Sequence, residues 1–201
     1  MKINLTNAGK RFNREWIFRQ ADLSFLPGEP TALTGPNGSG KSTLLQCIGG
    51  MLDLSEGKIE FSGISNEKAY NEISFCAPYL DLIEEMTLYE FLVFHSGFKP
   101  FLHNITVSTI IDEISLGAAR HKQIRYFSSG MKQRARLAQA IFSNTAIVLL
   151  DEPCSNLDDT GIALYHSLIE KYCQERVLLV CSNDPVEYQF CRRMVKITDY
   201  K

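Results

Sequence analysis

Residues 31–48 read TALTGPNGSGKSTLLQCI, and this stretch decides the fold. A short apolar run, 31–35, leads into a glycine-rich turn, and a helix-compatible run, 44–52, follows the turn. The apolar run has no alternating polar residues, which is typical of a strand that is buried on both faces. A buried strand, a glycine-rich turn and a helix in this order are the context that a phosphate-binding loop requires.

The turn GPNGSGKST (35–43) matches the pattern G-x-x-x-x-G-K-[ST]. Glycines in such a turn let the backbone wrap round phosphate oxygens with several N–H groups pointing inward. Lys41 is then expected to reach the β- and γ-phosphates, Ser42 to coordinate Mg²⁺ and Thr43 to hydrogen-bond the α-phosphate. The motif predicts a site for a nucleoside triphosphate or diphosphate. The expected binding residues are Gly35, Pro36, Asn37, Gly38, Ser39, Gly40, Lys41, Ser42 and Thr43.

The rest of the chain extends this pattern. Two more apolar runs, 146–150 and 177–181, are expected to be buried strands, and 131–142 and 161–174 are expected to be helices. Strands joined by long helical crossovers indicate a mainly parallel sheet that is covered on both sides. Three short segments near the N-terminus, 2–8, 22–26 and 58–63, favour antiparallel strands, and residues from about 85 to 127 favour a mostly helical insert. We therefore predict an α/β fold, with a P-loop NTPase core, an N-terminal antiparallel β subdomain and a helical insert, in one domain over 1–201.

Two carboxylates follow the strand at 146–150. Ligands collect at the carboxyl ends of the strands in a parallel sheet, so Asp151 is placed to hold Mg²⁺ through a water, and Glu152 to act as a general base toward water. The alternative is that the acidic pair simply begins a loop.

The segment YFSSGMKQRA (126–135) has the chemistry of a helix N-terminus. Ser128 and Ser129 are good N-caps, and the free N–H groups of a first helical turn attract an anion. Taken alone, the two serines are more simply explained as caps of a surface helix that binds nothing.

The composition of the chain excludes several classes of function. The 201 residues carry a formal net charge of −2, so bulk charge gives no support for nucleic-acid binding. The six cysteines form no C-x-x-C pair and mostly lie in apolar runs, which favours buried thiols in a reducing compartment. Residues 1–12 lack the apolar core of a signal peptide, and no run approaches the roughly 20 apolar residues that span a bilayer. We expect a soluble, cytoplasmic protein.

These motifs, in this order, resemble an ATP-binding-cassette (ABC) ATPase, the cytoplasmic motor subunit of an ABC transporter. GPNGSGKST resembles its Walker A motif, IVLLDE its Walker B motif and SNLD (155–158) its D-loop. Phe12, which lies 23 positions before Gly35, stands where the family has an aromatic residue that stacks on adenine. The alternative is an ordinary core aromatic.

The resemblance also gives 127–134, FSSGMKQR, a role as the signature motif, usually Leu-Ser-Gly-Gly-Gln. In the family, two cassettes pack head to tail, and ATP lies between the Walker A motif of one and the signature of the other. The resemblance thus implies a homodimer, or a pair with a related cassette, in which Ser128 and Gly130 face the partner's ATP. Phe127, Ser129 and Met131 depart from the family pattern.

Two further departures bear on catalysis. The family's Gln before the helical insert aligns with Pro78, and Tyr79 and Asp81 are the candidates to replace it. The family's His after a late strand aligns with Asn183, which cannot become cationic. Asn183 is alternatively a turn residue that caps the next helix. Because Glu152 is kept and two helpers are lost, the expectation is slow hydrolysis.

The resemblance implies a separate integral-membrane permease, received by a groove that would include residues 79–91. Glu84 and Glu85 in this stretch are either a recognition patch or a solvated loop. The short layout resembles the ATPase subunits of exporters, including the haem-exporter type, which act on the cytoplasmic face of the membrane. The alternative is a nucleotide-gated regulatory module with negligible hydrolysis. A ribosome- or DNA-directed ABC protein is disfavoured, because this chain has neither a second cassette nor a long coiled coil.

Overall fold

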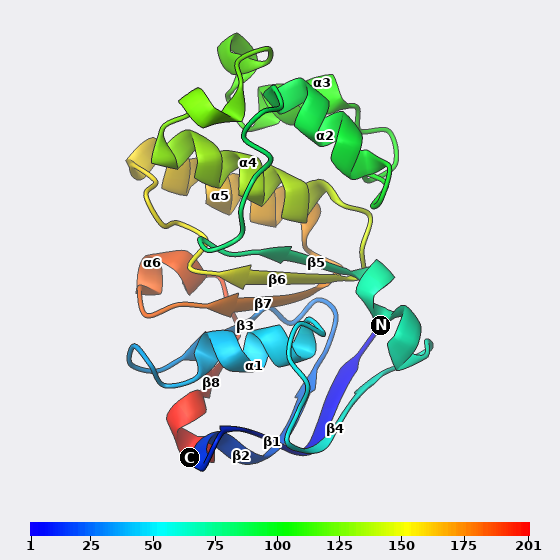
Figure 1. Cartoon of the computed structure of the whole chain (residues 1–201), viewed down its shortest axis with the longest axis vertical. Coiled ribbons are helices and arrows are strands. Elements are labelled where there is room, and N and C mark those ends of the chain that lie inside the picture. Colours follow the sequence, from blue (N-terminus) through cyan, green and yellow to red (C-terminus); the bar gives the residue numbers. More distant parts are fainter.

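A five-stranded parallel sheet forms the centre of the molecule in the computed structural model, which describes all residues 1–201 (Figure 1). The strand order is β5-β6-β7-β3-β8, and every neighbouring pair is parallel. The predicted parallel sheet is confirmed. The strands are β3 (Thr31–Thr34), β5 (Ile73–Cys76), β6 (Ile147–Asp151), β7 (Val177–Cys181) and β8 (Arg193–Lys196).

Strand β6 shows why these runs lack polar alternation. Ile147 and Leu149 belong to one hydrophobic core, whereas Val148 and Leu150 belong to the core on the opposite face. Successive side chains of a strand point to opposite faces, so a sheet that is covered on both sides needs apolar residues at every position.

A second, antiparallel sheet, with order β2-β1-β4, lies at one end of the molecule, and the helical insert lies at the other (Figure 1). Its strands are β1 (Ile3–Phe12), β2 (Glu15–Phe25) and β4 (Glu56–Phe61). The predicted N-terminal strands are therefore present, but β1 and β2 form a longer hairpin than expected. Its turn includes Asn13, whose φ is 55°.

Four helices flank the parallel sheet: α1 (Lys41–Ile48), α4 (Ser129–Phe142), α5 (Asp159–Tyr172) and α6 (Pro185–Tyr188). The predicted bounds of the first were wrong. Helix α1 begins at Lys41, directly after Gly40, and ends at Ile48 instead of Leu52. Gly50 has a φ of 73°, a left-handed conformation that ends a helix readily.

The insert between β5 and β6 contains α2 (Leu88–Ser96) and α3 (Val107–Glu113), with short 3₁₀ turns at Gly117–Ala119 and Ile124–Tyr126. It is less helical than predicted. Thr87 begins α2 with a capping box: its hydroxyl accepts from the Glu90 N–H, and the Glu90 carboxylate accepts from the Thr87 N–H. The apolar side of the insert packs with α4 and α5 in one core. Two 3₁₀ segments, Asn66–Glu72 and Ile197–Tyr200, complete the fold.

The C-terminal end of α4 is fixed by the buried guanidinium of Arg176. It donates to the carbonyl oxygens of Ile141, Ser143 and Thr145 at 2.6, 2.9 and 2.7 Å. A helix C-terminus leaves carbonyls without partners and carries partial negative charge, so a cation there is stabilising without a carboxylate. This contact ties α4 to the start of β7.

Candidate nucleotide-binding site

The glycine-rich turn forms the expected cradle between β3 and α1. Gly40 is the N-cap of α1 with a φ of 105°, and a Cβ at this position would lie 2.4 Å from Ile17 Cγ2. Both the backbone angle and the available space therefore require glycine. Residues 37–43, together with Ile17 and Glu152, line a cavity of about 250 Å³ at the N-terminus of α1.

The cradle holds donors that an anion can meet. Lys41 is buried, and its Nζ donates to the carbonyl oxygens of Gly35 at 2.8 Å and Pro36 at 3.3 Å. The Ser39 hydroxyl is also buried and has no hydrogen-bond partner. A buried polar group without a partner is costly unless a ligand supplies one. The turn thus combines a cation, an unpaired hydroxyl and a helix N-terminus, which together fit phosphate oxygens.

Asp151 ends β6 beside this cradle. The residue is 2% exposed, and neither carboxylate oxygen has a hydrogen-bond partner. Burial raises the pKa of the Asp151 carboxyl, although the nearby hydroxyls of Ser42 and Tyr79 act in the opposite direction. Two unpaired carboxylate oxygens close to a serine hydroxyl suit Mg²⁺, which binds one or two carboxylates plus substrate phosphates. No set of three His, Cys, Asp or Glu side chains forms a metal cage by itself.

Glu152 lines the same cavity in a strained conformation. Its φ is 45°, and its N–H donates to the Cys181 carbonyl at 2.9 Å. A non-glycine residue in this region persists only where the surrounding structure holds it, and such residues cluster at functional sites. The strain directs an exposed carboxylate toward the phosphate cradle.

Asn183 reaches the cradle from the end of β7. Its Nδ2 donates to Asn37 Oδ1 at 2.5 Å. The N-cap of α6 is Asp184, whose carboxylate accepts from the Val186 N–H at 2.9 Å. The side chain of Asn183 therefore faces the glycine-rich turn, and the capping role proposed for it as an alternative belongs to its neighbour.

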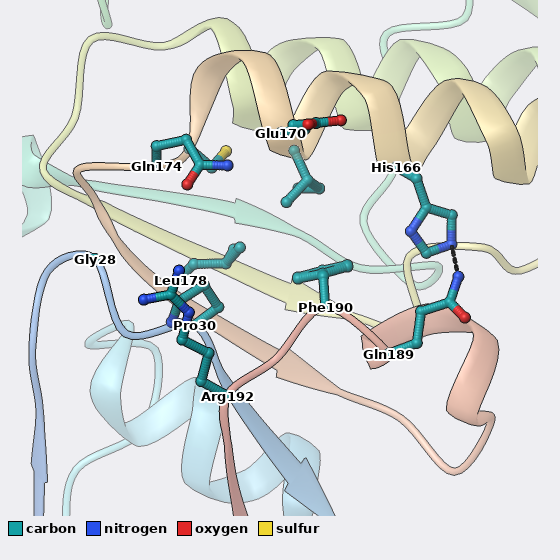
Figure 2. A pocket seen from close by; sticks show the side chains of 11 residues that line it. Gly28, Pro30, His166, Glu170, Gln174, Leu178, Gln189, Phe190 and Arg192 are labelled. Carbon is teal, nitrogen blue, oxygen red and sulfur yellow. Dashed lines mark hydrogen bonds between the residues drawn. The ribbon is translucent and has the colours of Figure 1, made fainter.

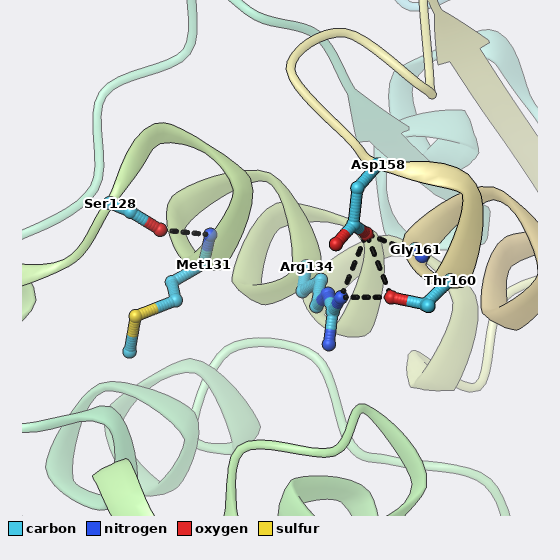
Figure 3. A network of polar contacts seen from close by, with 6 residues as sticks. All are labelled: Ser128, Met131, Arg134, Asp158, Thr160 and Gly161. Atoms are coloured by element: carbon cyan, nitrogen blue, oxygen red, sulfur yellow. Dashed lines mark hydrogen bonds and ion pairs between the residues drawn. The ribbon is translucent and has the colours of Figure 1, made fainter.

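The signature-like segment forms a separate cavity of about 300 Å³ at the start of α4. Ser128 is the N-cap of this helix and accepts from the Met131 N–H at 3.2 Å (Figure 3). A Cβ on Gly130 would lie 3.0 Å from the Asn156 carbonyl oxygen, so the segment packs closely on the turn after β6. On the far side of the cavity, Arg134 contacts Asp158 at 3.3 Å, and Asp158 caps α5 (Figure 3). This cavity shares no lining residue with the cavity of the glycine-rich turn.

The ABC transporter family model matches residues 18–155, which include the glycine-rich turn, Asp151, Glu152 and the signature-like segment. This chain belongs to the ABC transporter family. It is an ABC transporter ATP-binding cassette with a nucleotide-binding P-loop.

The chain is also similar in sequence to several curated ATP-binding proteins. The chain is 31% identical to the ABC transporter ATP-binding protein YybJ of Bacillus subtilis, over 83% of this chain and 78% of the relative. It is 28% identical to the cytochrome c biogenesis ATP-binding export protein CcmA of Mesorhizobium japonicum, over 90% of this chain and 91% of the relative. It is 27% identical to YdbJ of Bacillus subtilis over 86% of this chain, and the match spans 57% of that relative's length.

Solved structures share the fold. An ABC transporter ATP-binding protein from Pyrococcus furiosus superposes with a TM-score of 0.86 at 19% identity, covering 100% of both chains. A dimeric ATP-binding cassette bound to ADP and Pi superposes with a TM-score of 0.81 at 22% identity, covering 96% of this chain and 93% of that one.

Tyr79 directly follows Pro78, the residue that the sequence alignment sets against the family's Gln. The Leu80 N–H donates to the Ala77 carbonyl at 3.2 Å, which places Pro78 in a turn directly after β5. The turn brings the Tyr79 hydroxyl to Gln46 of α1, whose Nε2 donates to it at 2.9 Å. Burial raises the pKa of Tyr79 to about 12, so the phenol stays protonated and its own hydrogen remains free to donate. Sequence reasoning named Tyr79 as a candidate but did not predict the contact with Gln46.

Phe12 is not brought into the P-loop cavity of the cassette. It lies 46% exposed at the end of β1, with Lys10 Nζ 5.1 Å from its ring centroid, and Ile17 of the same hairpin lines the cavity instead. The ring is therefore an exposed surface aromatic, and the alternative that Phe12 belongs to the hydrophobic core is disfavoured.

Sequence reasoning missed two buried polar residues behind the site, Gln133 and Glu187. Gln133 is fully buried in α4 and donates to the Pro153 carbonyl at 2.8 Å. Glu187 lies in α6 and accepts from the Cys154 N–H at 2.8 Å. Each lies in a helix-compatible polar segment, where nothing in the local pattern distinguishes a buried residue from a solvated one.

A larger cavity, of about 500 Å³, lies between α5 and the segment before β8 (Figure 2). Its lining includes Pro30, His166, Glu170, Phe190 and Arg192. It shares no residue with the P-loop cavity, and it has neither a glycine-rich turn nor an unpaired buried carboxylate. The chemistry of the P-loop cavity, not its size, identifies it as the nucleotide site.

Proposed function

We propose that this cassette binds and hydrolyses ATP as the motor subunit of an ABC transporter and drives a separate membrane permease through ATP-dependent dimerisation. One observation carries the proposal: the buried, unpaired carboxylate of Asp151 lies beside the phosphate cradle, with the exposed carboxylate of Glu152 directly after it. In this account, residues 1–201 are one ABC ATPase domain, and residues 85–127 are its helical subdomain.

Each residue of the site has a role in the proposed reaction. The amides of 35–43 and the Lys41 ammonium bind the β- and γ-phosphates, and Asp151 and Ser42 hold Mg²⁺, which neutralises developing phosphate charge when bound. Glu152 accepts a proton from the attacking water. The new P–O bond forms at the γ-phosphorus as the bond to the β,γ-bridging oxygen breaks, and ADP and phosphate are released. Asn183 donates a hydrogen bond to the γ-phosphate. Phe12, which lies outside the P-loop cavity, stacks on the adenine ring.

The proposed composite site rests on the separation of the two cavities. The signature segment of this chain lines its own cavity and shares no residue with the P-loop cavity, so it does not complete the nucleotide site of the same chain. Ser128 and the Gly130 backbone would contact ATP held by a second cassette, either an identical copy or a related one. The free amides at the start of α4 would then face a γ-phosphate.

The permease proposal rests on exposed apolar side chains. On and after α2, Tyr89, Val93, Phe94 and Phe98 are 38–71% exposed. A groove of about 270 Å³, lined in part by Met51, Leu80 and Lys99, lies near the stretch 79–91. Large exposed apolar residues that gather on one element indicate an interaction surface. With a permease bound to this surface, the chain would act at the cytoplasmic face of the membrane. Its own helices lack the length and apolar character that crossing a membrane requires.

Glu84 and Glu85 do not support the idea of an acidic recognition patch. Glu84 pairs with Lys132, and Glu85 contacts Arg125 at 3.3 Å, so both carboxylates connect the loop before α2 to its neighbours within the chain. The apolar residues are therefore the better candidates for permease contact.

The test of this proposal combines binding with turnover. Lys41→Ala should weaken Mg·ATP binding at least tenfold by calorimetry, because it removes a buried cation at the phosphates; tenfold corresponds to about 1.4 kcal/mol. Unchanged affinity would exclude the phosphate site. Steady-state ATPase activity separates the motor from a nucleotide-gated regulatory module, the alternative that Pro78 and Asn183 favour. Co-purification with a multi-span membrane protein would test the permease.

A further inference from the structure

The turn after Glu152 is held from behind by a buried carboxylate. Glu187 is 6% exposed, and its Oε1 accepts from the Cys154 N–H at 2.8 Å. Its other oxygen, Oε2, is buried without a hydrogen-bond partner. A fully buried acidic residue is rare, because burial of a carboxylate is costly unless a specific contact requires it.

Glu187 makes one of three hydrogen bonds that hold the turn at residues 152–154. The Glu152 N–H donates to the Cys181 carbonyl, Gln133 Nε2 donates to the Pro153 carbonyl, and Cys154 N–H donates to Glu187. Three consecutive residues, 152–154, are thus held by β7, α4 and α6 respectively. A residue at a φ of 45°, as Glu152 is, needs such support on both sides.

The turn that this contact fixes runs between the two cavities: Glu152 lines the P-loop cavity, and Asn156 lines the cavity of the signature segment. Glu187 lies four residues after Asn183, which faces the P-loop, and Gln133 lies in the helix that begins at the signature segment. Beyond Cys154, the turn continues to Asn156, whose carbonyl packs against Gly130. A shift of residues 153–154 would therefore move the Glu152 carboxylate and the signature segment together.

We infer that Glu187 is a positioning residue that, through the Cys154 N–H, sets the direction of the Glu152 carboxylate toward the water that attacks ATP. The inference deepens the proposed ATPase function and rests on it. The contribution of Glu187 is the acceptor oxygen and not the negative charge. Burial raises the pKa of the Glu187 carboxyl, while the Ser182 hydroxyl opposes this effect, so a neutral side chain of the same shape suits the site.

Three variants separate this role from a general structural one. Glu187→Met keeps the volume but has no acceptor oxygen, whereas Glu187→Gln keeps the acceptor and removes the charge. Tyr165→Phe is the matched control: it removes the hydrogen bond from Tyr165 Oη to the Glu187 carbonyl, 2.9 Å, in the same buried region and leaves the Cys154 contact intact.

Three measurements apply to all three variants in the full chain: kcat, the Kd for ATP and hydrogen exchange of the Cys154 amide. In Glu187→Met we expect kcat to fall at least tenfold with the Kd for ATP within twofold of wild type. In Glu187→Gln and Tyr165→Phe we expect kcat within threefold of wild type. By hydrogen exchange, the Cys154 amide should exchange at least tenfold faster in Glu187→Met only.

The outcomes distinguish this inference from the proposed function. If Glu187→Gln loses kcat as Glu187→Met does, or if ATP affinity falls in parallel with kcat, the inference is wrong although the chain is an ATPase. If Cys154 exchange is unchanged in Glu187→Met, the clamp does not exist. If wild type binds ATP without hydrolysing it, the proposed function fails. Faster Cys154 exchange in Glu187→Met would then show only a structural contact, and the positioning role of Glu187 would be overturned.

Discussion

Asn183 Nδ2 donates a hydrogen bond to Asn37 Oδ1, across 146 positions of sequence and between the end of β7 and the glycine-rich turn. The relationship places an amide at the phosphate cradle where the family resemblance expects an imidazole. An amide can donate to a γ-phosphate oxygen, but it cannot become cationic or exchange a proton near neutral pH.

Asn183→His is expected to raise kcat about tenfold, because an imidazole can add charge to the transition state; tenfold corresponds to about 1.4 kcal/mol. Steady-state ATPase assays at saturating Mg·ATP check this. A lower kcat would mean that Asn37 has adapted to the amide, and unchanged kcat and ATP affinity would mean that position 183 does not act on the nucleotide.

Tyr79→Phe tests whether the phenol supplies part of the function of the missing Gln. The hydroxyl accepts from Gln46 and lies near Asp151, so its hydrogen can meet the water shell of a bound cation. We expect kcat to fall about fivefold to tenfold and the Mg²⁺ concentration for half-maximal ATP binding to rise. Tyr70→Phe, at a 63% exposed residue outside the P-loop cavity, is the control. Equal effects of the two variants would remove Tyr79 from the site.

Asp151→Asn should stabilise the protein in the absence of metal and abolish its stabilisation by Mg·ATP. The carboxylate is buried with neither oxygen paired, and an unsatisfied buried polar group costs about 1–3 kcal/mol. A neutral amide removes most of the cost of burying the charge, whereas the metal loses its protein ligand. Thermal unfolding with and without Mg·ATP measures both effects. A destabilised apo variant would show that Asp151 is already satisfied within the chain.

His95 makes stability depend on pH. Burial lowers the pKa of His95 to about 4, and its Nε2 lies 2.8 Å from the Ser143 hydroxyl. An unfolded His titrates near 6.5, so between pH about 6.5 and 4 the unfolded chain binds a proton that the folded chain does not. Stability from this residue is therefore present above pH 6.5 and is lost as pH falls through that window.

His95→Gln should flatten this dependence. From urea unfolding, we expect the loss in unfolding free energy between pH 7 and pH 5 to be smaller in the variant by on the order of 1 kcal/mol, after allowance for partial solvent screening. Identical losses in both proteins would show that His95 is protonated in the folded state at pH 5.

Some features of the fold and of the site could be predicted from particular residues of the sequence. Gly40 and the buried run before it predict the strand, the turn and the phosphate cradle, because backbone sterics and two-sided burial leave few alternatives. Asp151 and Glu152 follow from the rule that parallel strands present their carboxyl ends together. These features depend on local geometry and on one general rule of sheet topology.

The residues that sequence did not predict depend on contacts between distant segments. Pro78 marks a turn, but only the packing of that turn against α1 brings Tyr79 to Gln46. Glu187 follows a proline in a polar stretch, and its burial arises from the way that α6 packs beneath the turn after β6. Helix α1 was predicted to continue through Gly49 and Gly50 because the apolar pattern continues, whereas the φ of Gly50 ends it.

In the proposed dimer, the P-loop of one cassette and the signature segment of another enclose ATP. Sizing chromatography with light scattering tests it on Glu152→Gln, which should bind ATP without hydrolysing it and so accumulate the bound dimer by mass action. We expect a monomer without nucleotide, a dimer with Mg·ATP and no dimer when Ser128→Arg is added, because the arginine fills the space beside Gly130. A chain that stays monomeric with ATP bound, or a dimer that neither ATP nor Ser128→Arg alters, would exclude this shared ATP site.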